Sequence, residues 1–457
     1  MVDAQAAGSS ARSSSTLPAP APERPIDRAL SHVARGEPAE ALRYAIPLLE
    51  QEPRNALRCL VLGRALSIGG RSAVAERVLR RAIDLAVEQS NLPLAVAAAA
   101  FLDLPADEKR SVFEPLAQAF ARGSERLSDR RVVPPSFPAP AEAFEPLPES
   151  VDAEALLGRA ERVVPEDSSS AEFGSRRSLL PQPLFSTLIA DDLCSFMSIF
   201  DARVVEQGTC IIEEGELGDQ AFVVARGEFD VQKRGARDGE EPVHLARVGA
   251  GALIGEMALL SRAPRVATVV AARPGIVLIA QKSALDQLVS RAPEIGRRFA
   301  DHCKRRMVEN LVRTSEMFRA ASPGERPALV ERFVLRTFEP GEKLATQGVP
   351  SEGLFLIASG DVAIQHVDGA ERTLVAKLGP GDVVGEIALV FRRSSVADAV
   401  AQQPTVTLCL PRERFPELVR FHQKVFCDLY ELAAKRDQEI EFIAQEEATE
   451  GEDFVIV

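Results

Sequence analysis

Two hydrophobic patterns divide the chain. Between residues 26 and 122, Ala and Leu recur every three or four positions, which is the period of amphipathic helices. From residue 181 the apolar residues instead form short runs closed by glycines, such as 221–225 and 276–280, and these predict brief strands joined by tight turns. The helical period returns at 293–319 and after residue 420. The pattern predicts an α-helical N-terminal region followed by an α+β region.

The strand-rich part of the chain occurs twice. Three glycines recur at a constant offset of 133: Gly208 and Gly341, Gly215 and Gly348, and Gly227 and Gly360. The segment beginning at Gly385 repeats the one beginning at Gly255 at an offset of 130. The two copies therefore differ by three residues in the hairpin before this segment. Such a repeat predicts two domains of one fold, which we place at 181–320 and 321–435.

Residues 255–268, GEMALLSRAPRVAT, combine groups suited to an anionic ligand. The glycine at 255 lets the backbone approach a ligand closely, and a short helix after it would aim free amides at an anion. Arg265 supplies a cation that can pair with a phosphate. Glu256 and Arg265 alone would equally suit a surface ion pair, but the strand pattern on both sides favours a binding site.

This segment resembles the phosphate-binding cassette of cyclic-nucleotide-binding domains in its glycine, glutamate, Ala-Leu-Leu run, Pro-Arg pair and closing Ala-Thr. The resemblance implies antiparallel β-rolls of the jelly-roll kind with flanking helices. It implies that Glu256 takes the ribose hydroxyl and that Arg265 takes an exocyclic phosphate oxygen. The full set of ligand-binding residues that it implies is Gly255, Glu256, Ala258, Arg265, Val266 and Ala267.

The same resemblance indicates the base. In the family a threonine after the cassette arginine favours guanine, whereas this chain has Val266 there, so we expect cyclic AMP rather than cyclic GMP. The base also needs an apolar lid, which we expect from the helix containing Met307, Leu311 and Phe318. Ligand binding would then shift the helix at 293–319 relative to the roll.

The second copy keeps Gly385 and Glu386 but has Ser395 where the first has the phosphate arginine. A hydrogen bond to a charged group contributes about 1.5–3 kcal/mol, so the loss should weaken binding about ten- to a hundredfold. Asp398 would add a like charge near a phosphate, and Arg393 is an alternative cation two residues early. We expect a degenerate site in a domain that serves packing, dimerisation or partner contact.

The helical region at 26–122 resembles tetratricopeptide repeats. Gly36 recurs as Gly70 at an offset of 34, and Gly63 stands at the signature glycine. Cys59 and Leu66 replace the tryptophan and tyrosine of the signature, and an ordinary helical bundle is the alternative. Stacked repeats would present a concave surface for another protein. We expect a disordered leader at 1–25 and a Pro/Ser-rich linker at 123–180, with a short helix at 152–163.

Composition excludes several classes of function. The chain has 457 residues and a formal charge of −13, which tells against a nucleic-acid binder. The basic run at 302–306 lies in the helix at 293–319, so we interpret it as a solvated face. Six scattered cysteines and five histidines give no metal, disulfide or catalytic constellation. No run approaches the length of a membrane span and no secretory signal is present, so we expect a cytoplasmic protein without catalysis or cofactors.

The sequence therefore predicts a cytoplasmic cyclic-nucleotide sensor that acts on a protein partner through its helical repeats. One alternative is a structural scaffold with ligand-free β-rolls. Another is a kinase regulatory subunit, since the regulatory subunit of cyclic-AMP-dependent protein kinase carries Arg-Arg-x-Ser or Arg-Arg-x-Ala before two tandem domains. Here Ser178 follows Arg176-Arg177 directly, so the register differs. The acidic tail at 436–457 holds no DNA-reading element, and is either a disordered end or a short peptide for a partner.

Overall fold

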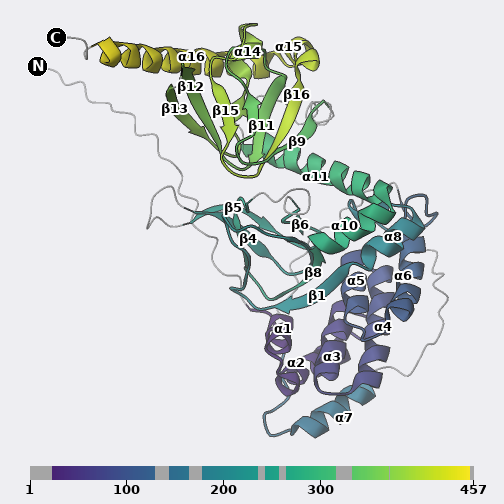
Figure 1. Ribbon diagram of the computed structural model, residues 1–457. Coiled ribbons are helices and arrows are strands. Elements are labelled where there is room, and N and C mark those ends of the chain that lie inside the picture. The colour runs from purple at the N-terminus through teal and green to yellow at the C-terminus, as the bar shows by residue number, and fades with distance from the viewer. Residues whose placement is uncertain are drawn as a thin grey trace, which may run out of the picture.

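The computed structural model describes residues 23–128, 144–163, 178–234, 242–256, 264–314, 332–369 and 371–452, without the side chains of Ala106, 308–314 and 443–452. Ala258, Phe318 and the Arg176-Arg177 pair lie outside these ranges, as do the side chain of Leu311 and most of the expected leader. Figure 1 shows a helical module, a first β-roll beside it and a second β-roll joined to the first through a long helix.

The helical module follows the predicted period. Its helices are α1 (Pro25–Arg35), α2 (Pro38–Gln51), α3 (Ala56–Ile68), α4 (Ser72–Glu88), α5 (Leu92–Ala100) and α6 (Ala106–Phe120). Gly36 and Gly70 both have positive φ, at 74° and 79°, which suits glycine at the turns between paired helices. At Gly63 a Cβ would lie 2.9 Å from Leu79 Cγ, so the glycine lets α3 and α4 approach closely. The helices and this spacing support the tetratricopeptide-like interpretation.

The first β-roll contains two antiparallel four-stranded sheets. Its strands are β1 (Phe200–Val205), β2 (Cys210–Ile212), β3 (Gln220–Arg226), β4 (Phe229–Lys233), β5 (Val243–Val248), β6 (Leu253–Ile254), β7 (Thr268–Ala271) and β8 (Gly275–Gln281). The sheet orders are β1-β8-β3-β6 and β2-β7-β4-β5. Phe222, Phe229 and Val277 pack between the two sheets. This closed pair of sheets is the predicted jelly-roll arrangement.

The second β-roll repeats the first strand for strand. Its strands are β9 (Val334–Phe338), β10 (Lys343–Ala345), β11 (Gly353–Ser359), β12 (Val362–Asp368), β13 (Glu371–Leu378), β14 (Val383–Val384), β15 (Asp398–Ala401) and β16 (Thr405–Pro411). The sheet orders are β9-β16-β11-β14 and β10-β15-β12-β13. Phe222 pairs with Ile254 in the first roll, and Phe355 pairs with Val384 in the second, at the predicted offsets of 133 and 130. The internal repeat is confirmed.

Further helices flank the two rolls. Before the first roll lie α7 (Ala153–Val163), the 3-10 turn η1 (Phe185–Thr187) and α8 (Ala190–Met197). After it come α10 (Lys282–Arg291) and α11 (Pro293–Thr314). The second roll contains α14 (Glu386–Val390) and is followed by the turn η2 (Arg412–Arg414), α15 (Phe415–Phe421) and α16 (Gln423–Glu452). Because α16 continues through Glu452, most of the expected acidic tail is helical, and a disordered end does not describe that part.

The helical module packs directly on the first β-roll. Strands β3 and β8 are apolar at consecutive positions because both faces of their sheet are covered. Val277 and Ile279 face the interior of the roll, whereas Ile276 and Leu278 join the hydrophobic core of the helices. Helices α1 and α5 contact this sheet, as Figure 1 shows. One continuous hydrophobic core therefore joins the module to the roll.

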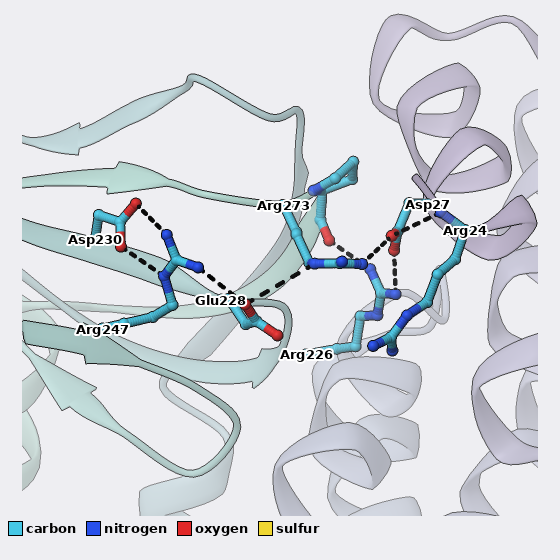
Figure 2. Close-up of polar contacts among 8 residues, drawn as sticks. Arg24, Asp27, Arg226, Glu228, Asp230, Arg247 and Arg273 are labelled. Carbon is cyan, nitrogen blue, oxygen red and sulfur yellow. Dashed lines mark hydrogen bonds and ion pairs between the residues drawn. The ribbon is translucent and has the colours of Figure 1, made fainter. Parts of the chain in front are cut away.

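A buried charge cluster fixes the same interface (Figure 2). The carboxylate of Asp27, on α1, is 1% exposed and pairs with Arg226 and Arg273 of the first β-roll. The Arg273 Nη1 to Asp27 Oδ2 distance is 2.8 Å. Oε2 of Glu228 lies 3.9 Å from Nε of Arg273 and 3.8 Å from Nη1 of Arg247, so the cluster continues along the roll. The cluster ties helix α1 to the turns that precede β4 and β8.

The segment at 144–163 also returns to the helical module. Arg43 donates hydrogen bonds to the backbone carbonyls of Pro148, Glu149 and Val151. Leu156 and Ala160 of α7 are fully buried, and α7 packs on α2 and α3. A short helix was predicted here, but its docking on α2 was not.

Candidate functional site

Arg265, which the cassette resemblance assigns to the phosphate, is held by the backbone of its own roll. Its Nη1 donates to the Gly255 carbonyl at 2.9 Å, and its Nη2 donates to the Gln220 carbonyl at 2.6 Å. The Arg265 amide donates to the Glu216 carbonyl, and its own carbonyl accepts from the Gly215 amide. Burial lowers the pKa of the guanidinium, against the opposing charges of Asp219 and Glu256. The arginine is thus a half-buried cation held by backbone carbonyls.

Two glycines make room for this guanidinium. A Cβ on Gly218 would lie 2.2 Å from Arg265 Nε, and a Cβ on Gly255 would lie 2.5 Å from Arg265 Nη1. Gly255 also has a φ of 74°, in the left-handed region that favours glycine. Gly218 was not among the predicted site residues because its neighbour Arg265 is distant in the chain.

Glu256 is buried beside the arginine. Its side chain is shielded from solvent, and burial raises the pKa of its carboxyl, while nearby Arg306 and Arg265 oppose that rise. Arg306 belongs to α11, so the helix that follows the roll brings a second cation to the cassette glutamate. Sequence reasoning missed Arg306 and interpreted residues 302–306 as a solvated face. Arg305 is exposed, but His302 and Cys303 are buried, so that interpretation was wrong for part of the run.

The remaining cassette residues are placed as follows. Val266 is partly exposed at 39%, and Ala267 is buried. Pro264 forms an isolated antiparallel bridge with Leu217, which holds the turn that delivers Arg265. Ala258 and the helix expected after Gly255 lie outside the described residues. The first site therefore brings together Gly255, Glu256, Arg265 and the following backbone.

The expected lid over the base is not formed by Met307. Its side chain is buried in the hydrophobic core of the second β-roll, with Phe333 and Leu354. Helix α11 is long enough for Phe299, near its start, to join the core of the helical module, while Met307 joins the core of the second roll. The lid prediction was therefore wrong for Met307, because the same helix serves two cores.

The second roll places Ser395 at the position of Arg265. Its backbone makes the same two hydrogen bonds, because its carbonyl accepts from Gly348 and its amide donates to the Val349 carbonyl. Ser395 is buried, and its hydroxyl has no hydrogen-bond partner among the described residues. The serine thus stands in the register of the phosphate arginine without its charge.

A second serine, Ser351, makes one hydrogen bond equivalent to a hydrogen bond of Arg265 in the first roll. Ser351 is the repeat equivalent of Gly218 at the offset of 133, so it occupies the position over which the guanidinium lies in the first roll. Its hydroxyl donates to the Gly353 carbonyl at 2.8 Å. Gly353 is the repeat equivalent of Gln220, whose carbonyl accepts from Arg265 in the first roll. The second roll therefore differs from the first at two neighbouring positions: Ser395 replaces the arginine, and Ser351 replaces the glycine that makes room for it.

Glu386 keeps the position of the cassette glutamate. It is buried and pairs with Arg436 of α16, with Arg436 Nη1 2.8 Å from Glu386 Oε1. The same Nη1 donates to the Val383 carbonyl at 2.7 Å. Arg436 is related to Arg306 by the same offset of 130 as the two cassettes, so the repeat extends through the helices that follow each roll. Continuing that offset into those helices would have identified both arginines.

The other two side chains weighed for the second site point to different partners. Asp398 is within 2.6 Å of Lys343 and accepts from the Gln347 amide at 2.8 Å. Burial would raise the pKa of the Asp398 carboxyl, but these hydrogen bonds outweigh it and lower the pKa. Arg393 pairs with Asp437 and lies over the Phe391 ring. The Asp398 carboxylate is thus paired with Lys343, which reduces its expected effect on a phosphate, and Arg393 does not replace Arg265.

The described residues contain no group of three or more His, Cys, Asp or Glu placed to hold a metal ion. They also contain no helix that is long and apolar enough to cross a membrane. The cysteines in the described part of the chain are free thiols.

Known proteins resemble the two rolls. A family model described as the cyclic nucleotide-binding domain matches residues 202–292 and 335–422. The cAMP-dependent protein kinase regulatory subunit of Colletotrichum orbiculare is 31% identical over 214 residues, covering 46% of this chain and 52% of that protein. The type II regulatory subunit of the same kinase from Drosophila melanogaster is 28% identical over 225 residues, covering 49% and 56%.

Among solved structures, the regulatory domain of Toxoplasma gondii PKA with cAMP is 24% identical, with a TM-score of 0.27, and the match covers 56% of this chain and 92% of that chain. The chain spans about half the length of the curated relatives it matches. The family match coincides with the two rolls, whose strand orders and cassette glycines repeat one another. The chain therefore carries two tandem cyclic nucleotide-binding domains and is homologous, over those domains, to regulatory subunits of cAMP-dependent protein kinase.

Proposed function

We propose that this chain is a regulatory, non-catalytic protein that binds cyclic AMP in its first β-roll and transmits binding to a protein partner. The observation that supports this most strongly is the state of Arg265. Its guanidinium is held by the carbonyls of Gly255 and Gln220, and it forms no ion pair with a carboxylate among the described residues. A shielded cation without a paired counter-charge favours an anionic ligand.

The ligand roles follow the cassette. The phosphate pairs with Arg265, and the ribose hydroxyl donates to the Glu256 carboxylate. Val266 offers no hydroxyl to a guanine base, which favours cyclic AMP over cyclic GMP. The names of the relatives from Colletotrichum orbiculare and Drosophila melanogaster, both cAMP-dependent kinase regulatory subunits, support the same choice.

Helix α11 supplies a route from the first site to the second roll. Burial raises the pKa of the Glu256 carboxyl, and Arg306 lies close enough to oppose that rise. The next residue, Met307, is buried in the second core. A ribose hydroxyl that binds Glu256 changes the interaction of this carboxylate with Arg306. Since a ligand shifts a conformation only through a difference in affinity between two states, the electrostatic interaction between Glu256 and Arg306 is the proposed source of that difference.

The partner surface is constrained by the fold. Helices α1 and α5 are covered by the first β-roll, so a partner of the helical module docks on its other faces. Regulation of a kinase catalytic subunit is the second candidate function, and the names of the relatives support it. Capture of such a subunit by the full chain, and its loss in Arg176→Ala/Arg177→Ala, would support that candidate. Retention of another partner after removal of the β-rolls would instead support the scaffold alternative.

Isothermal titration of the full chain with cyclic AMP and cyclic GMP tests the proposed ligand. We expect one cyclic AMP per chain, with weaker binding of cyclic GMP. Arg265→Ala should weaken cyclic AMP about ten- to a hundredfold, because it removes a charge-assisted hydrogen bond. Arg297→Ala removes an equal charge from an arginine on α11 whose side chain is 73% exposed, and should bind normally. A folded wild-type chain that binds neither nucleotide would refute the proposal.

A further inference from the structure

The second β-roll and helix α16 line a half-open cavity of about 360 Å³. Strands β12 and β13 contribute Ile364, Val375 and Leu378 to its wall, and the cassette contributes Ile387 and Ser395. Arg436 and Ile440 of α16 line another side of it. Small-molecule sites are typically concave, largely apolar and about 300–1,000 Å³ in volume. The cavity falls within that range, although the domain lacks the phosphate arginine.

The charges of the cavity disfavour an anion. Among the described residues that line it, the charged side chains are Glu386, Glu439 and Arg436. The single cation, Arg436, is already bound to Glu386 and to the Val383 carbonyl, and it lies 3.6 Å from Asp382. A phosphate would therefore meet two carboxylates and a cation that is already paired. Burying an unpaired charge is strongly unfavourable, so the cavity suits an uncharged ligand.

One polar group of the wall is left unsatisfied. Ser395 is 8% exposed, and its hydroxyl finds no partner among the described residues. Buried polar groups in proteins are rarely left without a hydrogen bond. The nearby Ser351 hydroxyl is satisfied by the Gly353 carbonyl, so the unsatisfied group is specific to the position that replaces Arg265. A ligand hydroxyl can supply the missing partner.

We propose that the second β-roll binds an uncharged nucleoside. This inference rests on the cassette roles given under the proposed function. The acceptor for the ribose is retained in Glu386 and the apolar wall for the base is retained in Ile364 and Ile387, whereas the phosphate cation is lost. The Ser395 hydroxyl then bonds the sugar hydroxyl that stands where a cyclic phosphate would be attached. The second domain is a ligand site of altered charge, in contrast to the degenerate site that the sequence predicted.

Adenosine and guanosine are the probes, titrated calorimetrically into the full chain. We expect saturable binding of one nucleoside per chain that persists when the first site is saturated with cyclic AMP. Ser395→Ala should weaken nucleoside binding about three- to tenfold through loss of one neutral hydrogen bond, with cyclic AMP binding unchanged. Arg265→Ala should leave nucleoside binding intact.

A converted site provides the complementary test. In Ser351→Gly/Ser395→Arg, the space and the cation of the first site are both restored, so we expect cyclic AMP stoichiometry to rise from one to two and nucleoside affinity to fall. Thermal melting checks that each variant is folded. Absence of nucleoside binding up to millimolar concentration, competition by cyclic AMP, or loss of nucleoside binding in Arg265→Ala would overturn the inference. Nucleoside binding without any cyclic AMP binding would refute the proposed function but support this inference.

Discussion

Gly218 is predicted to control the phosphate site without touching the ligand. In Gly218→Ala, the new methyl group would lie 2.2, 2.3 and 2.4 Å from the Nε, Nη2 and Cζ atoms of Arg265. The backbone at Gly218 is not in the left-handed region, so alanine suits its conformation. The guanidinium is the far end of a flexible side chain, so the arginine moves while the strands keep their places.

The substitution should weaken both binding and stability, and the two effects can be measured separately. Displacing Arg265 removes two hydrogen bonds of a charged group, to Gly255 and Gln220, which should cost the fold about 1.5–3 kcal/mol. The displaced cation no longer meets the phosphate, a contact that contributes about 1.5–3 kcal/mol, so cyclic AMP should bind about ten- to a hundredfold more weakly. Gly218→Ala should therefore reproduce most of the binding defect of Arg265→Ala.

Calorimetric titration of cyclic AMP, paired with thermal melting, measures both effects. Gly249→Ala is the matched control, since it lies in the same roll and its Cβ would meet only the Gly227 carbonyl, at 3.7 Å. It should bind like the wild type. Wild-type affinity in Gly218→Ala would show that the position of the Arg265 guanidinium does not determine ligand binding.

Two further predictions concern stability. Asp27→Asn should lower the free energy of unfolding by about 3–5 kcal/mol, because it leaves Arg226 and Arg273 without their buried counter-charge. In urea titrations, Glu23→Gln, which breaks the exposed Glu23–Arg28 pair, should cost less than about 1 kcal/mol, and equal effects of the two changes would contradict the structure. The pH dependence of stability should contain a contribution from His302, whose pKa is lowered by burial, and further by Arg306 and Arg305, from 6.5 to about 4. Below pH 6.5 the unfolded chain takes up this proton and the folded chain does not, so stability should fall as pH drops toward about 4. Melting curves of His302→Gln should lack this part of the decline. Identical pH profiles for the wild type and His302→Gln would exclude a contribution from His302.

The sequence determined the repeat, the fold class and the first cassette. The eight glycines of the two copies recur at fixed offsets because each stands at a turn with positive φ, from 74° to 111°, where glycine has no steric cost. The replacement of Arg265 by Ser395 was also evident from register alone. These features are visible in a linear sequence because they depend on residue identity, spacing and local backbone conformation.

The tertiary structure decided what surrounds the cassettes. Asp27 meets Arg226 and Arg273 across 199 and 246 residues, and no periodicity predicts such a contact. The tertiary structure also showed that Met307 packs in the second core and that Arg436 lies against Glu386 at the second cavity. Ser351 became meaningful only once the space occupied by Arg265 was known. Packing brings these residues together from distant parts of the chain, so their roles depend on which surfaces the fold buries against one another.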